Sequence, residues 1–321
     1  MFYWPALCGL FILRVRRLVL SYQHSFHAGN HADVLKHLVL VAVLERLNLK
    51  TKPYFFLDTH AGEGLYNLNS QQALQNAEAK TGVLQLNLGG HLGDVQNASV
   101  KQESALFDTY VDIVNKYIGD QQYPGSPMVA SALLRRGDKA FAAELHPQAF
   151  ESLKQNCRRA GIIAQHRDGY EILNAVLPPT PNRGAVLIDP PYEQMSEYEQ
   201  VIDAVANAVK RWPIGTYMIW YPLLSDTRED RKTKEIVSNP KSALSEKMLS
   251  QLSGLNVKSV LNIQFCSVKP SQKVGMYGSG MCIVNPPWQL DSDLHKILET
   301  LQQKLSGDNN RQSKVEWLKT E

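Results

Sequence analysis

The sequence has few cysteines, and none lies close enough to another to suggest a shared site. Cys8, Cys157, Cys266 and Cys282 are far apart and form no Cys-x-x-Cys motif. This spacing argues against a thiolate zinc site and gives no sign of a disulfide framework. A reducing, cytoplasmic compartment is therefore expected.

The sequence also lacks an apolar run long enough to cross a bilayer. The apolar stretch from Phe2 to Leu13 is shorter than the roughly 20 residues that a spanning helix needs. Its arginines, Arg14, Arg16 and Arg17, follow it, whereas the charges of a signal peptide come first. We predict no membrane anchor and interpret residues 1–19 as an N-terminal extension that is disordered or results from a misassigned translation start.

A strong excess of charge of one sign is absent as well. The 321 residues have a net charge of +3, and the content of 44% hydrophobic and 20% charged residues is that of a globular protein with a sizeable core. A mildly basic chain is compatible with a polyanionic partner but does not require one. We find no internal repeat and no long low-complexity tract.

Short apolar runs that end in polar residues alternate with segments of helical spacing. Helical spacing is clear at Pro147–Ala160 and Glu197–Trp212, and the apolar runs cover residues 54–57, 141–143, 185–188, 217–221, 257–265 and 281–284. This alternation predicts an α/β fold with a doubly wound parallel sheet. Such a sheet binds its ligand beyond the carboxyl ends of the strands.

The spacing of these runs predicts how the chain is divided. Residues 59–140 separate the first two strands, far more than the about 30 residues of a whole crossover unit, so a helical insertion is expected there. The mixed-charge stretch 226–247 is interpreted as a solvated or mobile loop rather than a site. The predicted units are a sheet domain (20–65 and 137–290), a mainly helical insertion (66–136) and a helical or flexible tail (291–321).

The most informative motif is Asp189-Pro190-Pro191-Tyr192, which directly follows a buried strand. Both prolines lack an N–H and restrict the backbone, so the motif predicts a rigid turn. The turn offers a carboxylate, unpaired carbonyl groups and an aromatic ring, which together can hold a planar base that carries an amino group. The alternative is a strand that prolines end beside an exposed tyrosine.

Three other strand ends carry groups that suit a nucleoside cofactor. Gly62 and Gly64 form a glycine turn after the first strand, without the third glycine of the dinucleotide fingerprint. Glu144 can accept both hydroxyls of a ribose, and Asp168, followed by Gly169, can accept a hydrogen bond from an adenine amino group. The order of these groups along the chain is stronger evidence than any one of them.

A further helix start suits a carboxylate ligand. Ser126 is predicted as its N-cap and Pro127 as its first residue, so free N–H groups point at a ligand. A plain capped helix is the alternative.

A dense polar cluster precedes an apolar helix near the N-terminus. Asn30, Asp33 and His37 share one helical face, with Lys36 beside them, on a helix otherwise suited to burial. Buried polar groups need partners, and a ligand or an internal polar network can supply them. No complete metal ligand set at a recognised spacing appears, so no metal is predicted.

A second copy of the proline motif, Asn285-Pro286-Pro287-Trp288, ends the last predicted strand. We interpret it as structural because a polar tail follows it, whereas a helix that packs on the sheet follows Asp189.

Together these motifs resemble the class I methyltransferases that use S-adenosylmethionine, and more closely the bacterial RlmJ family, adenine-N6 methyltransferases of large-subunit ribosomal RNA. The resemblance covers about Leu20 to Trp288, through SYQHSFHAGNHADVLKH, LDTHAGEG, YPGSP, ELHP, DG, LIDPPY, WYP and SGMCIVNPPW. The chain departs from the family pattern before Val19, at Glu63, and between Asp226 and Lys247.

The resemblance implies transfer of a methyl group from S-adenosylmethionine to the amino group of adenine 2030 in 23S ribosomal RNA, with Asp189 as the catalytic residue. It implies a contact of Tyr22 with the RNA. Hydrogen bonds from the amino group to Asp189 and the Pro190 carbonyl would make the nitrogen a better nucleophile, while Tyr192 stacks on the base. The expected cofactor-binding residues are Lys36, His37, His60, Gly62, Ser126, Glu144, Asp168 and Gly169.

Two alternatives remain open. The same motif occurs in enzymes that methylate adenine in DNA, although those usually carry a domain that reads the target. The other alternative is a non-catalytic RNA-binding protein with this fold. The presence of Glu144, Asp168 and Asp189 argues against it. The basic pairs Arg135-Arg136, Arg158-Arg159 and Lys210-Arg211 could hold phosphates or form a solvated surface. We expect large-subunit ribosomal RNA as partner, no membrane association and a monomer.

Overall fold

The computed structural model describes residues 23–86, 105–230, 232–268, 274–305 and 312–320. Tyr22 and residues 1–19 lie outside these ranges, so the predictions for them stay predictions. Among the described residues, no helix is long and apolar enough to cross a membrane.

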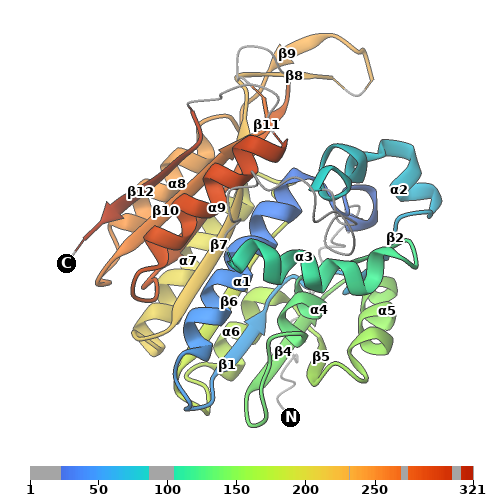
Figure 1. The fold of residues 1–321 in the computed structure, drawn as a ribbon. Helices are drawn as coiled ribbons and strands as arrows, with labels where there is room; N and C mark the ends of the chain where they lie inside the picture. Colours follow the sequence, from blue (N-terminus) through green and yellow to red (C-terminus); the bar gives the residue numbers. More distant parts are fainter. Residues whose placement is uncertain (1–22, 87–104, 231, 269–273, 306–311, 321) are drawn as a thin grey trace, which may run out of the picture.

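An eight-stranded sheet forms the centre of the molecule (Figure 1), in the order β12-β10-β11-β7-β6-β1-β4-β5. Neighbouring strands pair in parallel from β5 to β7, whereas β11 runs antiparallel to both β7 and β10. The strands are β1 (Phe55–Asp58), β4 (Lys139–Glu144), β5 (Ile162–His166), β6 (Gly184–Ile188), β7 (Thr216–Leu224), β10 (Val260–Cys266), β11 (Met276–Val284) and β12 (Lys314–Lys319). This is the predicted class I methyltransferase sheet, in which β6 returns to the other side of β1 and creates a topological switch point.

Two layers of helices cover the sheet. The first packs around α1 (His31–Asn48) and comprises α3 (Ala105–Ile118), α4 (Ser126–Ser131), α5 (Pro147–Cys157) and α9 (Leu290–Leu305). The second comprises α6 (Gly169–Val176), α7 (Ser196–Arg211) and α8 (Leu244–Ser253). Each layer buries its apolar side chains against one face of the sheet, which gives two hydrophobic cores.

Helix α1 has apolar residues on every side, and other elements surround it. It packs on α3, α4, α9 and the sheet, and the Asn30 side chain caps its start by accepting from the N–H groups of Ala32 and Asp33. A helix that is buried all round needs an internal partner for each polar group. This requirement falls on Asp33, Lys36 and His37, which are all buried.

The connection between β1 and β4 contains helices and a small antiparallel ribbon that the sequence did not predict. The ribbon consists of β2 (Leu65–Asn67) and β3 (Gln122–Pro124). The helical segments of this connection are α2 (Gln71–Asn76), η2 (Glu78–Thr81), η3 (Val83–Leu86), α3 and α4. Since α3 and α4 pack on α1, this connection contributes to the first core.

The C-terminal tail differs from its prediction at one point. Helix α9 agrees with a helical tail, but β12 pairs with β10 and forms the edge of the sheet. Leu318 and Val315 on β12 pack against opposite cores. The tail therefore completes the sheet, which a helical or flexible tail would not do.

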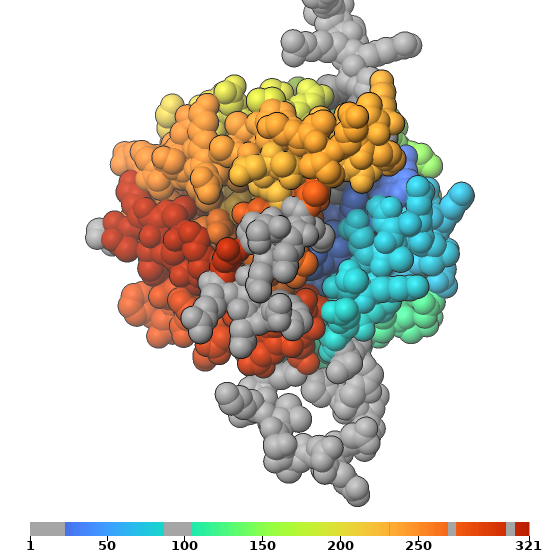
Figure 2. Space-filling view, turned by 90° about the horizontal axis from the view of Figure 1, so that it is seen from above, coloured from blue at the N-terminus to red at the C-terminus, as the bar shows by residue number. Residues whose placement is uncertain are grey.

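The stretch 226–247 is also more ordered than a solvated loop. It contains the hairpin of β8 (Thr227–Glu229) and β9 (Ile236–Ser238) and leads into α8. Buried Asn239 fixes the base of the hairpin through its side-chain bond to the Ser225 carbonyl. Figure 2 shows the molecule from the end at which this hairpin lies. The orange and yellow segments after β7 and the cyan insertion lie on either side of the blue residues at the start of the described chain.

Candidate active site

A cavity of about 450 Å³ opens at the carboxyl ends of β1, β4 and β6. This position is the switch point of the sheet, and the volume is in the range of roughly 300–1,000 Å³ that is usual for small-molecule sites. Every predicted site residue that the structure describes lines it: Lys36, His37, His60, Gly62, Ser126, Glu144, Asp168, Gly169, Asp189, Pro190 and Tyr192. The structure thus brings residues from six parts of the chain to one place, and their individual roles remain predictions.

The glycine turn after β1 requires Gly62. Its φ of +59° is left-handed, and a Cβ built at this position would lie 2.1 Å from the Tyr66 hydroxyl. The Gly62 N–H donates to Glu144 Oε2 at 2.9 Å, which ties the turn to the end of β4. The position of the glycine turn therefore depends on Glu144, and that of the Glu144 side chain depends on the turn.

Glu144 and Asp168 keep free acceptor capacity toward the cavity. Glu144 accepts one backbone hydrogen bond on each oxygen, from Gly62 and His146. Asp168 caps α6 with Oδ1, which accepts from the N–H groups of Tyr170 and Glu171. A carboxylate has about four acceptor sites. Both groups can consequently accept hydrogen bonds from the hydroxyls or amino group of a ligand, although burial raises the pKa of Glu144.

The loop of the proline motif has an unusual backbone that other segments hold in place. Tyr192 adopts a left-handed conformation (φ +49°), which is uncommon for a residue other than glycine and clusters at functional sites. The Lys241 ammonium donates to the Tyr192 carbonyl at 2.8 Å and to the Glu193 carbonyl at 3.3 Å. Lys241 comes from the stretch that the sequence analysis had set aside as a loop without a site, and that interpretation was wrong.

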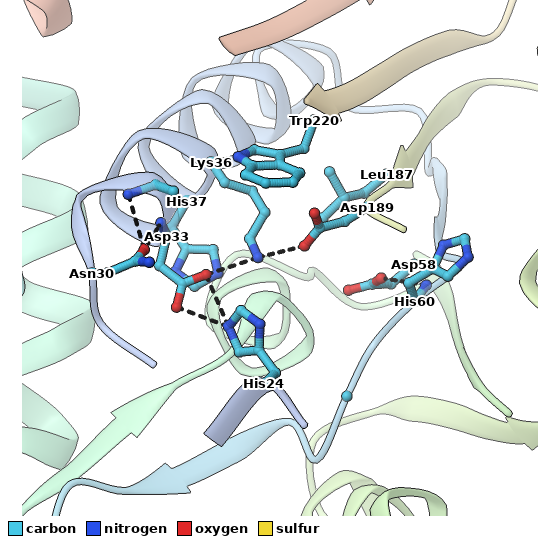
Figure 3. A network of polar contacts seen from close by, with 12 residues as sticks. His24, Asn30, Asp33, Lys36, His37, Asp58, His60, Leu187, Asp189 and Trp220 are labelled. Atoms are coloured by element: carbon cyan, nitrogen blue, oxygen red, sulfur yellow. Dashed lines mark hydrogen bonds and ion pairs between the residues drawn. The ribbon is translucent and has the colours of Figure 1, made fainter. Parts of the chain in front are cut away.

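The Tyr192 ring is more enclosed than a simple stacking platform. It is 2% exposed, packs between Tyr198 and Trp220, and donates its hydroxyl to the Trp220 carbonyl. The partly buried Trp220 ring also lines the cavity, close to Asp189 in Figure 3. The sequence analysis named the motif WYP but did not predict Trp220 as a site residue, because Trp220 lies within a strand and not at its end.

A chain of charged groups, buried at Asp33 and Lys36 and partly buried at His24 and Asp189, connects α1 to the proline motif (Figure 3). The Lys36 ammonium lies 2.6 Å from Asp189 Oδ2 and 2.8 Å from Asp33 Oδ1, and His24 Nε2 lies 2.9 Å from Asp33 Oδ2. The Gly29 N–H also donates to Asp33. Sequence analysis had predicted a cofactor contact for Lys36. It did not predict these ion pairs, which place the ammonium beside the expected catalytic carboxylate.

The charges in this chain stabilise one another. Burial alone would raise the pKa of Asp33, but the neighbouring His24 and Lys36 outweigh it and hold that pKa well below its usual range. Burial alone would lower the pKa of Lys36, but the carboxylates of Asp189 and Asp33 hold it well above its usual range. Lys36 is therefore a permanent cation beside Asp189, the expected catalytic residue.

Two histidines of the cavity, buried His37 and partly buried His60, have lowered pKa values. Burial lowers the pKa of His37 to about 3 and that of His60 to about 4. His37 Nδ1 lies 2.8 Å from the Tyr123 hydroxyl, and its buried Nε2 has no hydrogen-bond partner among the described residues. A buried polar atom without a partner, on the wall of a cavity, is a place where a polar ligand group fits.

The lowered pKa of His37 predicts that the folded protein loses stability in acid. Because its pKa falls from about 6.5 to about 3 on folding, the unfolded chain binds more protons between these pH values. The free energy of unfolding should therefore fall as the pH drops through this window, by up to about 1.4 kcal/mol per pH unit for one histidine. In urea titrations at several pH values, His37→Gln should reduce this slope. His295→Gln on the exposed surface of α9 is the control, and equal slopes for the two variants would contradict the assignment.

Ser126 differs from its predicted role as a helix cap. The N-cap of α4 is Gly125, and Ser126 is the first residue of the helix, with Pro127 after it. The Gly125 N–H donates to the Gly64 carbonyl, so the glycine turn fixes the start of the helix. Ser126 is buried and still lines the cavity.

The second proline motif is structural, but the predicted reason for this was wrong. Helix α9 does follow it, and packs against α1 and β10. Because β11 is antiparallel to β7, its carboxyl end lies beside the amino-terminal ends of the parallel strands. Asn285 is therefore at the opposite end of the strands from Asp189. There its side-chain amide donates to the carbonyls of Pro213 and Gly215, each at 3.0 Å.

The described residues contain no group of three His, Cys, Asp or Glu side chains arranged to hold a metal ion. The polar atoms of the cavity instead suit an organic ligand with hydroxyl, amino and carboxylate groups.

Comparison with known proteins identifies the family. Residues 51–319 match the family model described as "Ribosomal RNA large subunit methyltransferase D, RlmJ". The chain belongs to the RlmJ family. Two relatives named "Ribosomal RNA large subunit methyltransferase J" are similar over 94% of this chain. The relative from Haemophilus influenzae is 37% identical with all of its length covered, and that from Escherichia coli K12 is 35% identical with 99% covered.

A solved structure has a similar fold over almost its whole length. This protein, from Legionella pneumophila, is 31% identical, with a TM-score of 0.73 over 91% of the present chain and 97% of its own. The chain is therefore a methyltransferase of the RlmJ family, and the cavity at the switch point of its sheet is the candidate active site.

Proposed function

We propose that this protein transfers a methyl group from S-adenosylmethionine to the exocyclic amino group of an adenine in large-subunit ribosomal RNA, at adenine 2030 of 23S ribosomal RNA. The observation that carries the proposal is the position of Asp189. Its carboxylate lies in the same cavity as the glycine turn, Glu144 and Asp168, which suit a nucleoside cofactor.

The cavity fits the cofactor by the chemistry of its walls. Glu144 and Asp168 have acceptor sites to spare for ribose hydroxyls and the adenine amino group. His37 Nε2 offers a polar partner for the amino acid part. When bound, S-adenosylmethionine supplies an electrophilic methyl group.

The residues of this chain prepare the acceptor. The lone pair of an adenine amino group is delocalised into the ring, so the nitrogen is a poor nucleophile until it becomes more tetrahedral. Hydrogen bonds from the amino group to Asp189 and to the Pro190 carbonyl favour this geometry. Lys36 holds the Asp189 carboxylate in position through their ion pair, and the rings of Tyr192 and Trp220 bound the space for the base.

The test offers labelled S-adenosylmethionine to the purified protein with deproteinised large-subunit RNA, intact large subunits or duplex DNA. Transfer to the amino group of adenine in RNA supports the proposal. Transfer to DNA alone would identify a DNA methyltransferase, and transfer to none of the acceptors would reject the proposed reaction.

A further inference from the structure

The cavity that receives the target adenine is poorly suited to hold the rest of an RNA. Its lining contains seven Asp or Glu residues against two Lys residues. Phosphates are repelled by such a surface, whereas protein–RNA affinity depends largely on cations that neutralise phosphates. The affinity for a large RNA must therefore come from another part of the surface.

Exposed cations gather at the opposite, amino-terminal edge of the sheet. The adjacent strands β1, β4 and β5 begin there. Six exposed side chains at these strand starts, which we call the basic edge, are Lys50, Lys52, Arg136, Lys139, Arg158 and Arg159. Since neighbouring strands lie about 4.8 Å apart, the three strand starts are close enough to face one RNA backbone.

These six cations are not needed to hold the fold together. Arg135 and Arg183, at the same edge, donate to main-chain carbonyls at and beyond the end of α1 and so have a structural role. None of the six side chains of the basic edge forms an ion pair with another residue that the structure describes. The one carboxylate in the loops that lead into these strands, that of Asp138, is buried and bonded to Arg135 and Tyr54.

The basic edge is within reach of an RNA that leaves the cavity. Helix α5 begins at the rim, where Gln148 and Ala149 line the cavity, and ends next to Arg158. Its 11 residues span about 16 Å. Exposed Lys154 lies between the two ends of this path.

We propose that the basic edge binds the phosphate backbone of large-subunit ribosomal RNA away from the target adenine, with the RNA passing over α5. The inference rests on the proposed function. The basic edge reads no sequence, because its cations meet phosphates rather than bases. It adds affinity for a long RNA and leaves the chemistry at the cavity unchanged.

The test compares long and short substrates. The variant Lys50→Glu/Lys52→Glu/Arg158→Glu/Arg159→Glu should raise KM for deproteinised 23S ribosomal RNA at least about tenfold, with kcat unchanged. The slope of log affinity against log salt should fall by roughly 0.7–0.9 for each phosphate that the variant no longer neutralises. A trinucleotide with the target adenine at its centre extends by one nucleotide, roughly 3.4 Å of strand axis, to either side. It is too short to cross α5 to the basic edge, so its KM should not change.

Two further proteins make the result decisive. Lys116→Glu and Lys296→Glu together reverse exposed charges on α3 and α9 and should leave KM within about twofold. A version of the four-residue variant with glutamine in place of glutamate tests the same cations if charge reversal impairs folding. Equal KM values for the control and both variants on the long RNA would overturn the proposal.

Filter binding of the long RNA without cofactor separates this inference from the proposed function. If the wild-type protein binds the RNA through the basic edge but transfers no methyl group, the proposed function fails and the inference stands. If transfer occurs and RNA binding is unaffected by the substitutions, the inference fails and the proposed function stands.

Discussion

Asp189→Asn should reduce methyl transfer to ribosomal RNA by about 10²- to 10⁴-fold, the range for a positioned group that acts directly on the reacting atoms. The amide keeps the size of the side chain but offers one acceptor oxygen in place of two and loses the charge that pairs with Lys36. Cofactor affinity should change little, because the proposed ribose and adenine contacts are Glu144 at the end of β4 and Asp168 at the start of α6. Single-turnover rates and equilibrium binding of S-adenosylmethionine measure the two effects.

Two comparisons give this result its meaning. Asp203→Asn, on the exposed face of α7, removes a carboxylate outside the cavity and should leave the rate unchanged. Asn285→Ala removes the two hydrogen bonds of the second motif and should cost about 1–3 kcal/mol of stability without changing the rate in the folded protein. A rate loss in Asn285→Ala as large as in Asp189→Asn would show that the two motifs had been assigned the wrong way round.

Lys36→Met should lower the free energy of unfolding by about 3–5 kcal/mol, as expected when one partner of a buried ion pair is removed. The change leaves Asp33, which is 2% exposed, and Asp189 without the cation between them. Transfer activity should fall as well, since the ion pair with the ammonium holds the Asp189 carboxylate in position. Urea titration measures the first effect, and the transfer assay with deproteinised RNA measures the second.

A second substitution tests whether the buried charge is the cause. Asp33→Asn in the Lys36→Met background removes one uncompensated carboxylate and should recover part of the missing stability, because the two changes are coupled. Lys154→Met, on the exposed face of α5, is the control for removal of an ammonium. If Lys36→Met costs no more stability than this control, the charge chain does not stabilise the fold.

The sequence predicted the parallel part of the sheet better than its antiparallel edge. The run from Ala185 to Ile188 lies within β6, which is buried along its whole length, and a buried strand is apolar throughout. Strand β12 escaped prediction because it lies at the edge of the sheet, with lysines at both ends that resemble a solvated tail. The direction of β11 depends on its partners rather than on its own residues, so it could not be read from the motif that follows it.

The candidate site was predictable at the carboxyl ends of the parallel strands, where a residue ends a strand or follows it within two positions. Glu144, Asp168 and Asp189 were found this way, because parallel strands bring their carboxyl ends to one edge. The ion pair between Lys36 and Asp189 joins residues 153 positions apart, and no local pattern in the sequence encodes it. The same is true of Lys241 and the Tyr192 carbonyl. Polar groups on a helix that is otherwise buried indicated that partners existed, but not which ones.

The packing of α1 has a consequence for how the protein is made. This helix is among the first elements synthesised, yet it packs against β11 and α9, which are among the last. At translation rates of about 5–20 residues per second, the part of its apolar surface that faces β11 and α9 stays uncovered for roughly 10–50 s. Exposed apolar surface of this kind favours aggregation, so we expect the nascent chain to need chaperones during that time. The cation that accompanies Asp189 is held on this same helix, so a chain that stops before α9 should carry no methyltransferase activity.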